Sequence, residues 1–319
     1  MRVQGTASSS PSTAIKSYYV FVVCGTRVKV MINNFKLKYA VVPVAGLGTR
    51  FLPVTRTVPK VLLPIISTPV IEFAVREIAE IGIENIVFVI GPDMEMVKDY
   101  FKPNSKLMDY LKRSNQIELQ KQQSEISKLA DISVIYQSKP RGLGDAILLT
   151  QKFVGYNPFL VVLPDDLVFH EISASQQLVN SRKNNEATFV ALTPVQNSEI
   201  PKKGIISGHE LQKNFYKITH MIEKPSINEA PSNLSIVGRY ILTNEIFDAL
   251  RDTKPGKGDE IQLTDGINLL KTGTDVYGVV LNGHHIDVGN PSGMLEAMLR
   301  ASKSDSEIRK TIKSIVSKW

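Results

Sequence analysis

A buried strand that runs directly into a glycine loop limits most strongly what this chain can fold into. Residues 39–44 are apolar and largely β-branched, and they are followed by Ala45, Gly46, Leu47 and Gly48. An apolar run of this length is typical of a strand covered on both faces, as in a parallel sheet. Two glycines allow the backbone to approach a phosphate, whose oxygens free N–H groups can bind. By itself, the loop fits a purely structural turn equally well.

The loop differs from two common phosphate-binding motifs. Position 51 is Phe51 rather than a third glycine, so the dinucleotide fingerprint G-x-G-x-x-G is not present here. A Walker loop would require Gly-Lys-Ser/Thr after a four-residue gap, and this requirement is not met either. The pattern therefore disfavours an NAD-binding oxidoreductase.

The hydrophobic pattern downstream predicts alternating helices and strands. Helical spacing covers residues 69–81 and stops at Gly82, and a second buried strand is predicted at 85–90. Strand, helix and strand at this spacing form a βαβ unit, which implies a parallel sheet with a right-handed crossover. Further strands are predicted at 132–136, 159–163, 187–192, 215–222, 235–242 and 275–281, and further helices at 244–250, 261–270 and from 291 onward.

The chain is predicted to hold one main domain with extensions at both ends. We expect residues 38–300 to form this domain, with a polar helical insertion at about 103–131 and a helical tail at 301–319. Residues 1–37 are interpreted as an extension that is disordered or results from an artefactual start, with Met31 as the true start. A signal peptide is a weaker interpretation, because the apolar run in the extension is short.

Composition excludes several classes of protein. Of the 319 residues, 43% are apolar, which is enough for a sizeable core. The net charge of +7 suits anionic ligands, but no basic and aromatic signature predicts nucleic-acid binding. Cys24 is the single cysteine, so neither an intrachain disulfide nor a cysteine metal site is expected, which suits the cytoplasm. The sequence holds no apolar run long enough for a transmembrane helix.

The residues after the loop extend it into a much longer pattern. From Gly46 to Pro64 the chain reads G-x-G-T-R-x-x-P-x-T-x-x-x-P-K-x-x-L-P. This pattern resembles the signature of the sugar nucleotidyltransferases, close to the UTP–glucose-1-phosphate uridylyltransferases. The resemblance runs from residue 38 to about residue 300. It also includes Gln137 and the segments 142–146, 163–166, 223–225, 238–240, 260–265 and 287–289.

The resemblance implies an α/β fold with a Rossmann-like mixed, mainly parallel sheet flanked by helices. It also implies transfer of a nucleotidyl group from UTP to glucose 1-phosphate, with release of pyrophosphate. Both reactants are anions, so positioning and charge neutralisation must carry the catalysis. The attacking phosphate is ionised near neutral pH, so no general base is required. A homo-oligomer, a dimer or a tetramer, is expected, without a nucleic-acid or membrane partner.

The same resemblance assigns roles to individual residues. Arg50, Lys60 and Lys224 are the expected catalytic cations. Nucleotide binding is expected from Ala45, Gly46, Gly48, Thr49, Gln137 and Gly142, and sugar-phosphate binding from Gly204, Glu223, Lys224 and Gly238. The expected cofactor is Mg²⁺, which prefers hard oxygen ligands and often takes one or two carboxylates besides substrate phosphates. Asp165 and Asp287 are the expected ligands, and Asp166 is an alternative to Asp165.

Two residues depart from the pattern of the uridylyltransferases. Val61 stands where a glutamate usually follows the signature lysine, and Asp145 replaces the histidine of Gly-Leu-Gly-His. Both positions are expected near the nucleotide, so these changes affect the expected base preference and turnover rate. They leave three alternatives open: the UTP enzyme, the same reaction with another base or sugar such as dTTP, and a catalytically weak regulatory relative.

Overall fold

The computed structural model describes residues 17–23, 26–32, 36–182, 186–270 and 274–318. The chain forms two compact units, residues 1–36 and 37–319. In the first unit, β1 (Ser17–Val23) and β2 (Thr26–Ile32) pair as an antiparallel hairpin. The remainder of the predicted extension at 1–37 lies largely outside the described residues, and its disordered or artefactual nature stays a prediction.

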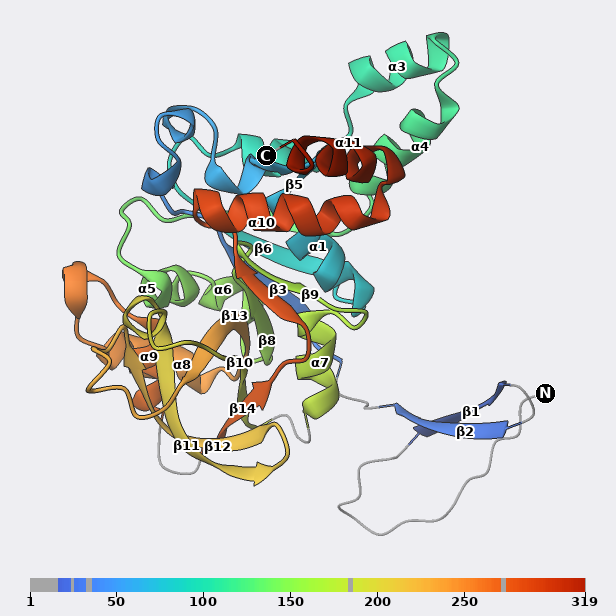
Figure 1. Ribbon diagram of the computed structural model, residues 1–319. Coiled ribbons are helices and arrows are strands. Elements are labelled where there is room, and N and C mark those ends of the chain that lie inside the picture. The colour runs from blue at the N-terminus through green and yellow to red at the C-terminus, as the bar shows by residue number, and fades with distance from the viewer. Residues whose placement is uncertain (1–16, 24–25, 33–35, 183–185, 271–273, 319) are drawn as a thin grey trace. The chain divides into compact units, whose positions relative to one another are not determined.

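A mixed sheet organises the second unit. Within its described residues the sheet has nine strands in the order β10-β14-β12-β11-β13-β8-β3-β6-β7 (Figure 1). The strands are β3 (Tyr39–Pro43), β6 (Asn85–Ile90), β7 (Asp131–Tyr136), β8 (Phe159–Val162), β10 (Thr188–Pro194), β11 (Gly204–Gln212), β12 (Phe215–Glu223), β13 (Leu234–Leu242) and β14 (Val276–Val280).

The expected mixed α/β fold is confirmed. Strands β8, β3, β6 and β7 pair in parallel, as do β10 and β14, whereas the other pairings of the sheet are antiparallel. A short turn joins β11 to β12, and so short a connection can only join antiparallel strands. Strand β11 was not predicted, because only Ile205 and Ile206 of its nine residues are buried and it shows no clear apolar period.

Helices cover both faces of the sheet because alternate strand residues supply two separate cores. On one face, Val42 and Phe88 pack with α1 (Val70–Glu80) and α7 (Ala174–Ser181). On the other, Val41 and Val87 belong to the cluster that includes four further helices. These are α5 (Leu143–Leu148), α6 (Gln151–Val154), α8 (Glu245–Asp252) and α9 (Leu263–Asn268). Burial on both faces explains why the strands read as continuous apolar runs.

A third apolar cluster fixes the C-terminal part beside the glycine loop. Met294 and Ala297 of α10 (Pro291–Ala301) pack with Ile65, Leu167 and Ile286. These last three belong to β4 (Pro64–Ile65), β9 (Asp166–Phe169) and β15 (His284–Asp287). Helix α10 thereby packs both against β4, which follows the signature, and against β9 and β15, which carry Asp166 and Asp287. Strand β4 pairs in turn with β5 (Thr68–Pro69).

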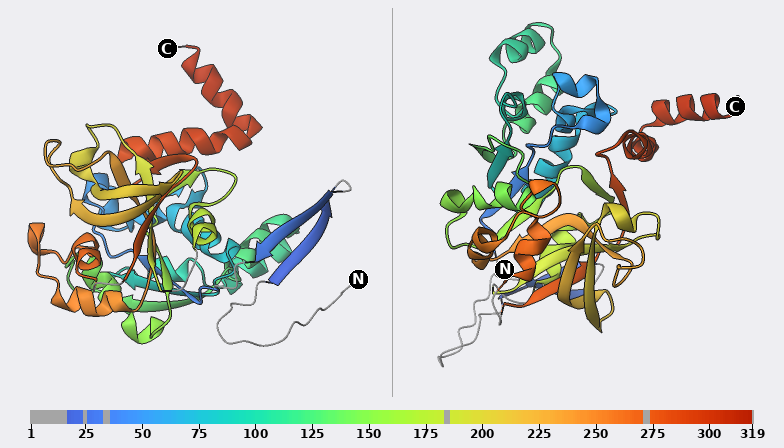
Figure 2. Two further views of the ribbon diagram at one scale, coloured as in Figure 1. Left: turned by 90° about the horizontal axis from the view of Figure 1, so that it is seen from below. Right: turned by 90° about the vertical axis from the view of Figure 1, so that its left-hand side faces the viewer.

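The remaining α-helices of the described residues lie in or just before the predicted insertion and in the C-terminal tail. Helices α3 (Ser105–Arg113) and α4 (Ile117–Ile126) fall in the segment predicted to be a helical insertion, which follows the short α2 (Met96–Asp99). Helix α11 (Ser306–Val316) is directed away from the sheet in both views of Figure 2. Among the helices of the described residues, none is long and apolar enough to cross a membrane.

Candidate active site at the carboxyl edge of the parallel strands

The parallel strands deliver the predicted site residues to one edge of the sheet. Strand β3 ends at the glycine loop, β7 leads directly into Gln137, and β8 is followed by Leu163, Pro164 and Asp165. Ligands of open α/β sheets bind beyond these carboxyl ends. The fold therefore gathers residues that lie far apart in the sequence.

Gly48 shapes the loop through its backbone. Its φ of 64° lies in the left-handed region, and an added Cβ would lie 3.0 Å from Lys60 Cβ. The hydroxyl of Thr55 donates a 2.8 Å hydrogen bond to the Gly48 carbonyl, which closes the loop on the short helical turn of residues 54–56. Gly48 and Thr49 line neither of the two pockets described next, so their predicted contact with the nucleotide stays a prediction.

The first pocket has a volume of about 280 Å³. Its lining comes from the end of β3, from the residues that follow β3, β7 and β8, from α5, and from Lys60 and Glu260. The predicted site residues in its wall are Ala45, Gly46, Lys60, Gln137, Gly142 and Asp165. Four of the six predicted nucleotide-binding residues therefore share one pocket.

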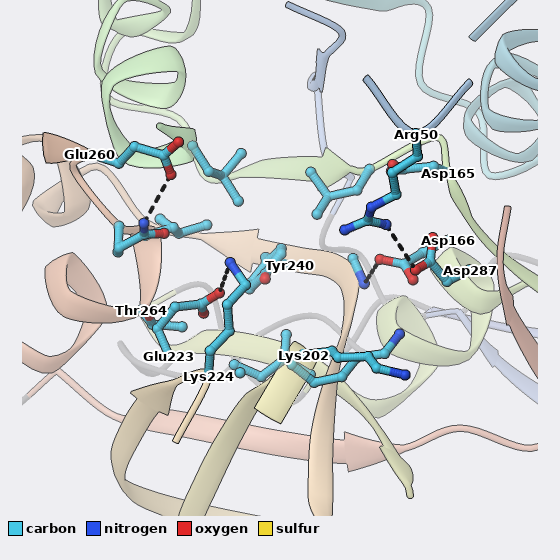
Figure 3. A pocket seen from close by; sticks show the side chains of 18 residues that line it. Arg50, Asp165, Asp166, Lys202, Glu223, Lys224, Tyr240, Glu260, Thr264 and Asp287 are labelled. Atoms are coloured by element: carbon cyan, nitrogen blue, oxygen red, sulfur yellow. Dashed lines mark hydrogen bonds and ion pairs between the residues drawn. The ribbon is translucent and has the colours of Figure 1, made fainter. Parts of the chain in front are cut away.

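The second pocket has a volume of about 320 Å³ and adjoins the first. The four predicted sugar-phosphate residues Gly204, Glu223, Lys224 and Gly238 line it, as do Arg50, Asp165 and Asp287. Figure 3 shows Arg50 and the aspartates on one side of this pocket and Glu223 and Lys224 on the other. Asp165 lines both pockets, so it lies at their junction.

Each of the two predicted metal ligands is paired with a predicted catalytic cation. Lys60 donates a hydrogen bond to the Asp165 carboxylate, and an Arg50 guanidinium nitrogen lies 3.6 Å from Asp287 Oδ2. The two carboxylates border one small volume, because a Cβ added to Gly289 would lie 2.8 Å from Asp287 Oδ1 and 2.9 Å from Asp165 Oδ2. The fold thus brings together acidic groups from β15 and from the end of β8.

The acidic groups suit a hard cation that takes further ligands from substrate. In the described part of the chain, no cluster of three or more His, Cys, Asp or Glu side chains is placed to hold a metal ion. Two carboxylates completed by phosphate oxygens and water are a common set for Mg²⁺. Asp165 and Asp287 are therefore a pair of ligands that Mg²⁺ would complete with phosphate oxygens and water.

Asp166 is already engaged by the protein. Its Oδ1 lies 2.5 Å from His285 Nε2, and its Oδ2 accepts a 3.1 Å hydrogen bond from the Gly238 amide. Burial disfavours the ionised carboxylate, but the hydrogen bond and charge of His285 outweigh this and lower the pKa of Asp166 to about 2. Asp166 therefore links β9, on which it lies, to β15 and β13. It also lines the second pocket, whereas Asp165 lines both pockets.

A buried ion pair between Arg239 and Glu77 lies behind the turn after β8, and the sequence did not predict it. Arg239 has no exposed side-chain surface, and it donates hydrogen bonds of 2.7 and 2.8 Å to Glu77 of α1 and of 2.9 Å to the Leu163 carbonyl. Burial alone would raise the pKa of Glu77, but Arg239 and the hydrogen bonds from Ser175 lower it. The pair fixes the turn that carries Asp165. Arg239 lies in a predicted motif, but nothing local marks Glu77 as its partner.

The sugar-phosphate residues have an unusual local backbone. Lys224 has a φ of 49°, which is uncommon for a residue with a side chain, and its ammonium lies 3.0 Å from Glu223 Oε1. Such conformations cluster at functional sites. A Cβ on Gly238 would lie 2.5 Å from the Leu163 Cβ, so packing against the chain after β8 itself requires glycine there.

Four further residues, for which the sequence predicted no role, line the second pocket: Lys202, Lys203, Tyr240 and Glu260. Tyr240 and Glu260 lie in segments that carry the resemblance, whereas the two lysines do not. Lys203 contributes to the low pKa of Asp166. The two lysines precede β11, a strand that the apolar pattern did not reveal, so their proximity to the aspartates could not be predicted.

The two departures from the family pattern lie in different surroundings. Val61 is 1% exposed and belongs to the apolar cluster beneath the sheet, so its side chain packs in the core. Asp145 instead accepts a 2.7 Å hydrogen bond from the side-chain amide of Gln137, which lines the first pocket. The departure at Asp145 therefore directly contacts a predicted nucleotide-binding residue.

Comparison with known proteins identifies the family. A model of the nucleotidyl transferase family matches residues 39–304. The chain is 37% identical to a putative UTP–glucose-1-phosphate uridylyltransferase of Methanocaldococcus jannaschii, over 88% of this chain and 99% of that protein. It is also 37% identical to the UTP–glucose-1-phosphate uridylyltransferase of Bacillus subtilis, over 86% of this chain and 94% of that protein.

A solved structure agrees with these relatives. The crystal structure of a UDP-glucose pyrophosphorylase complexed with UDP-glucose superposes with a TM-score of 0.76 at 36% identity, over 84% of this chain and all of the other. The match in sequence, fold and length, together with the two adjoining pockets at the carboxyl edge of the sheet, places this protein in the nucleotidyl transferase family.

Proposed function

We propose that this protein transfers the uridylyl group of UTP to glucose 1-phosphate, which yields UDP-glucose and pyrophosphate. Two relatives are named for this activity, and this chain matches 99% and 94% of their lengths. The observation that carries the proposal is the position of Asp165 in the walls of both pockets. A nucleotide in the first pocket and a sugar phosphate in the second would meet beside this carboxylate.

The reaction needs alignment and charge neutralisation more than proton transfer. The sugar-phosphate oxygen attacks the α-phosphorus, the bond from that phosphorus to the bridging oxygen of pyrophosphate breaks, and the charge that develops on pyrophosphate must be balanced. Lys60 lines the nucleotide pocket, and Arg50 lines the adjoining one beside Asp287. These cations bind the triphosphate oxygens and hold the α-phosphate toward the nucleophile.

The two carboxylates are assigned to Mg²⁺. Asp165 and Asp287 would hold the ion, which supplies Lewis-acid stabilisation of the phosphate charge when bound. Lys60 pairs with Asp165, and Arg50 lies beside Asp287, so both carboxylates have a neighbouring positive charge. Both cationic side chains lie close enough to the carboxylates to contact phosphate oxygens of a substrate bound beside them.

The second pocket provides polar groups for the sugar phosphate. The Lys224 ammonium binds the phosphate of glucose 1-phosphate, and the Glu223 carboxylate accepts hydrogen bonds from sugar hydroxyls. Both side chains line the pocket, and they already lie within 3.0 Å of each other. The left-handed backbone of Lys224 places these consecutive residues on the same side of the pocket.

A pyrophosphate-release assay tests the function. The protein is incubated with Mg²⁺, one nucleoside triphosphate and one sugar 1-phosphate, and all pairs from UTP, dTTP, CTP, glucose 1-phosphate and N-acetylglucosamine 1-phosphate are compared. We expect the highest kcat/KM for UTP with glucose 1-phosphate, and measurable use of dTTP. The absence of pyrophosphate release with every pair would contradict the proposal and favour a regulatory relative.

We also propose a homo-oligomer that acts in the cytoplasm. The single cysteine suits a reducing compartment. Leu295 and Leu299 expose apolar surface on α10, which could be covered by a second copy of the chain. Light scattering coupled to size-exclusion chromatography would measure the mass of the assembly, and a mass near the 35.4 kDa of one chain would contradict the oligomer.

A further inference from the structure

The side-chain amide of Gln137 is held in one orientation inside the first pocket. Gln137 is 5% exposed, and its Nε2 donates hydrogen bonds of 3.1 Å to the Gly142 carbonyl and 2.7 Å to Asp145 Oδ2. Both partners are pure acceptors, so the reverse orientation would place the amide oxygen against two other oxygens. The orientation is therefore set by the protein before any nucleotide binds.

This arrangement uses both donors of the amide and leaves its acceptor available. The NH₂ group has two hydrogens, which match the two acceptors. Among the described residues, Oε1 receives no hydrogen bond, and Gln137 lines the pocket. The Gln137 side chain therefore presents its oxygen, a hydrogen-bond acceptor, to a base in the pocket.

We infer that Asp145 sets base selectivity by holding the Gln137 amide so that Oε1 faces the nucleotide. The inference rests on the proposed function, since it takes the first pocket as the base site. Uracil carries a hydrogen on N3 and can donate it to Oε1. Cytosine in the same pose presents a lone pair at N3, which leaves two acceptors facing each other. Asp145 is a positioning residue, because it acts on the base only through Gln137.

The Asp145 carboxylate can only accept hydrogen bonds, so it keeps Nε2 rather than Oε1 of Gln137 turned toward it. An asparagine at position 145 would have nearly the same shape, but its amide can either accept from Nε2 or donate to Oε1. In such a variant only the Gly142 carbonyl still favours the original orientation. The amide of Gln137 can then turn and offer Nε2 to N3 of cytosine.

Titration calorimetry of UTP and of CTP, each with Mg²⁺, tests the inference. We expect the wild-type protein to prefer UTP, and Asp145→Asn and Asp145→Ala to lower the ratio of the two affinities by about fivefold to tenfold, the worth of about one hydrogen bond. The matched control is Asp109→Asn, which changes the charge equally on the exposed face of α3 and should keep the wild-type ratio.

The ratio of the UTP and CTP affinities shows whether Asp145 positions Gln137 or only stabilises the fold. A variant that merely folds less well loses affinity for UTP and CTP alike, so an unchanged ratio in Asp145→Asn and Asp145→Ala overturns the inference. Equal affinity of the wild-type protein for both nucleotides overturns it as well. Because binding is measured without turnover, a protein that releases no pyrophosphate would contradict the proposed function while the affinity ratio still reports on Asp145.

Discussion

Lys60 donates a hydrogen bond to Asp165, although 105 residues separate them in the chain. Their side chains are 23% and 27% exposed, so the pair lies at the pocket surface rather than in the core. It links the signature loop after β3 to the turn after β8. In the proposed function, Asp165 would hold the metal ion and Lys60 would bind the triphosphate, so each partner has a second role beyond this hydrogen bond.

Removing the charge of Asp165 should abolish most catalysis. Asp165→Asn weakens the expected Mg²⁺ site where charge develops, so we expect kcat to fall by roughly two orders of magnitude or more. Steady-state kinetics at saturating Mg²⁺ measure this, with Asp109→Asn as the charge-matched control. Near-normal turnover of Asp165→Asn would show that this carboxylate does not hold the metal.

The two lysines should affect different kinetic constants. Lys60 lines the nucleotide pocket and Lys224 the sugar-phosphate pocket. Lys60→Ala should therefore lower kcat more than it weakens sugar-phosphate binding, whereas Lys224→Ala should mainly raise the KM for glucose 1-phosphate. Initial rates with either substrate varied measure both effects. The opposite pattern would mean that the assignments of the two pockets must be exchanged.

Breaking the buried ion pair should destabilise the whole domain. Glu77→Gln leaves the Arg239 charge buried without its counter-ion, and we expect a loss of about 3–5 kcal/mol in the free energy of unfolding. Urea denaturation near neutral pH measures this, and Glu80→Gln on the exposed side of α1 is the matched control. A change below about 1 kcal/mol in Glu77→Gln would show that the pair stabilises little.

The same pair should make stability depend on acid pH. Because the pKa of Glu77 is lowered in the folded protein from its ordinary value of 4.5, its ionisation stabilises the fold above that value. This stabilisation is lost as the pH falls from about 4.5 toward the lower folded pKa. The stability difference between wild type and Glu77→Gln should therefore shrink on acidification. A difference that stays constant between pH 7 and pH 3 would contradict this linkage.

The N-terminal segment should be dispensable. Strands β1 and β2 pair with each other, and the large sheet begins at β3. Deletion of residues 1–30, which leaves Met31 as the first residue, should therefore preserve both activity and Tm. Thermal unfolding and the pyrophosphate assay measure these two properties. A fall of several degrees in Tm on truncation would show that the hairpin contributes to the stability of the domain.

The sequence by itself determined the local elements and the chemical motif. Apolar runs predicted β3, β6 and β8, and helical spacing predicted α1, because burial on two faces or on one stripe leaves a local period. The spacing of glycine, arginine and lysine in the signature led to the family, which the comparisons then showed.

Only the tertiary structure decided which distant groups meet. No local pattern pairs Glu77 with Arg239 across 162 residues, or places Asp165 and Asp287 around Gly289, since such contacts follow from sheet order. The departures at positions 61 and 145 looked alike in the sequence. Strand and helix packing turns Val61 into the core and Asp145 toward Gln137, because the direction of a side chain depends on the backbone around it.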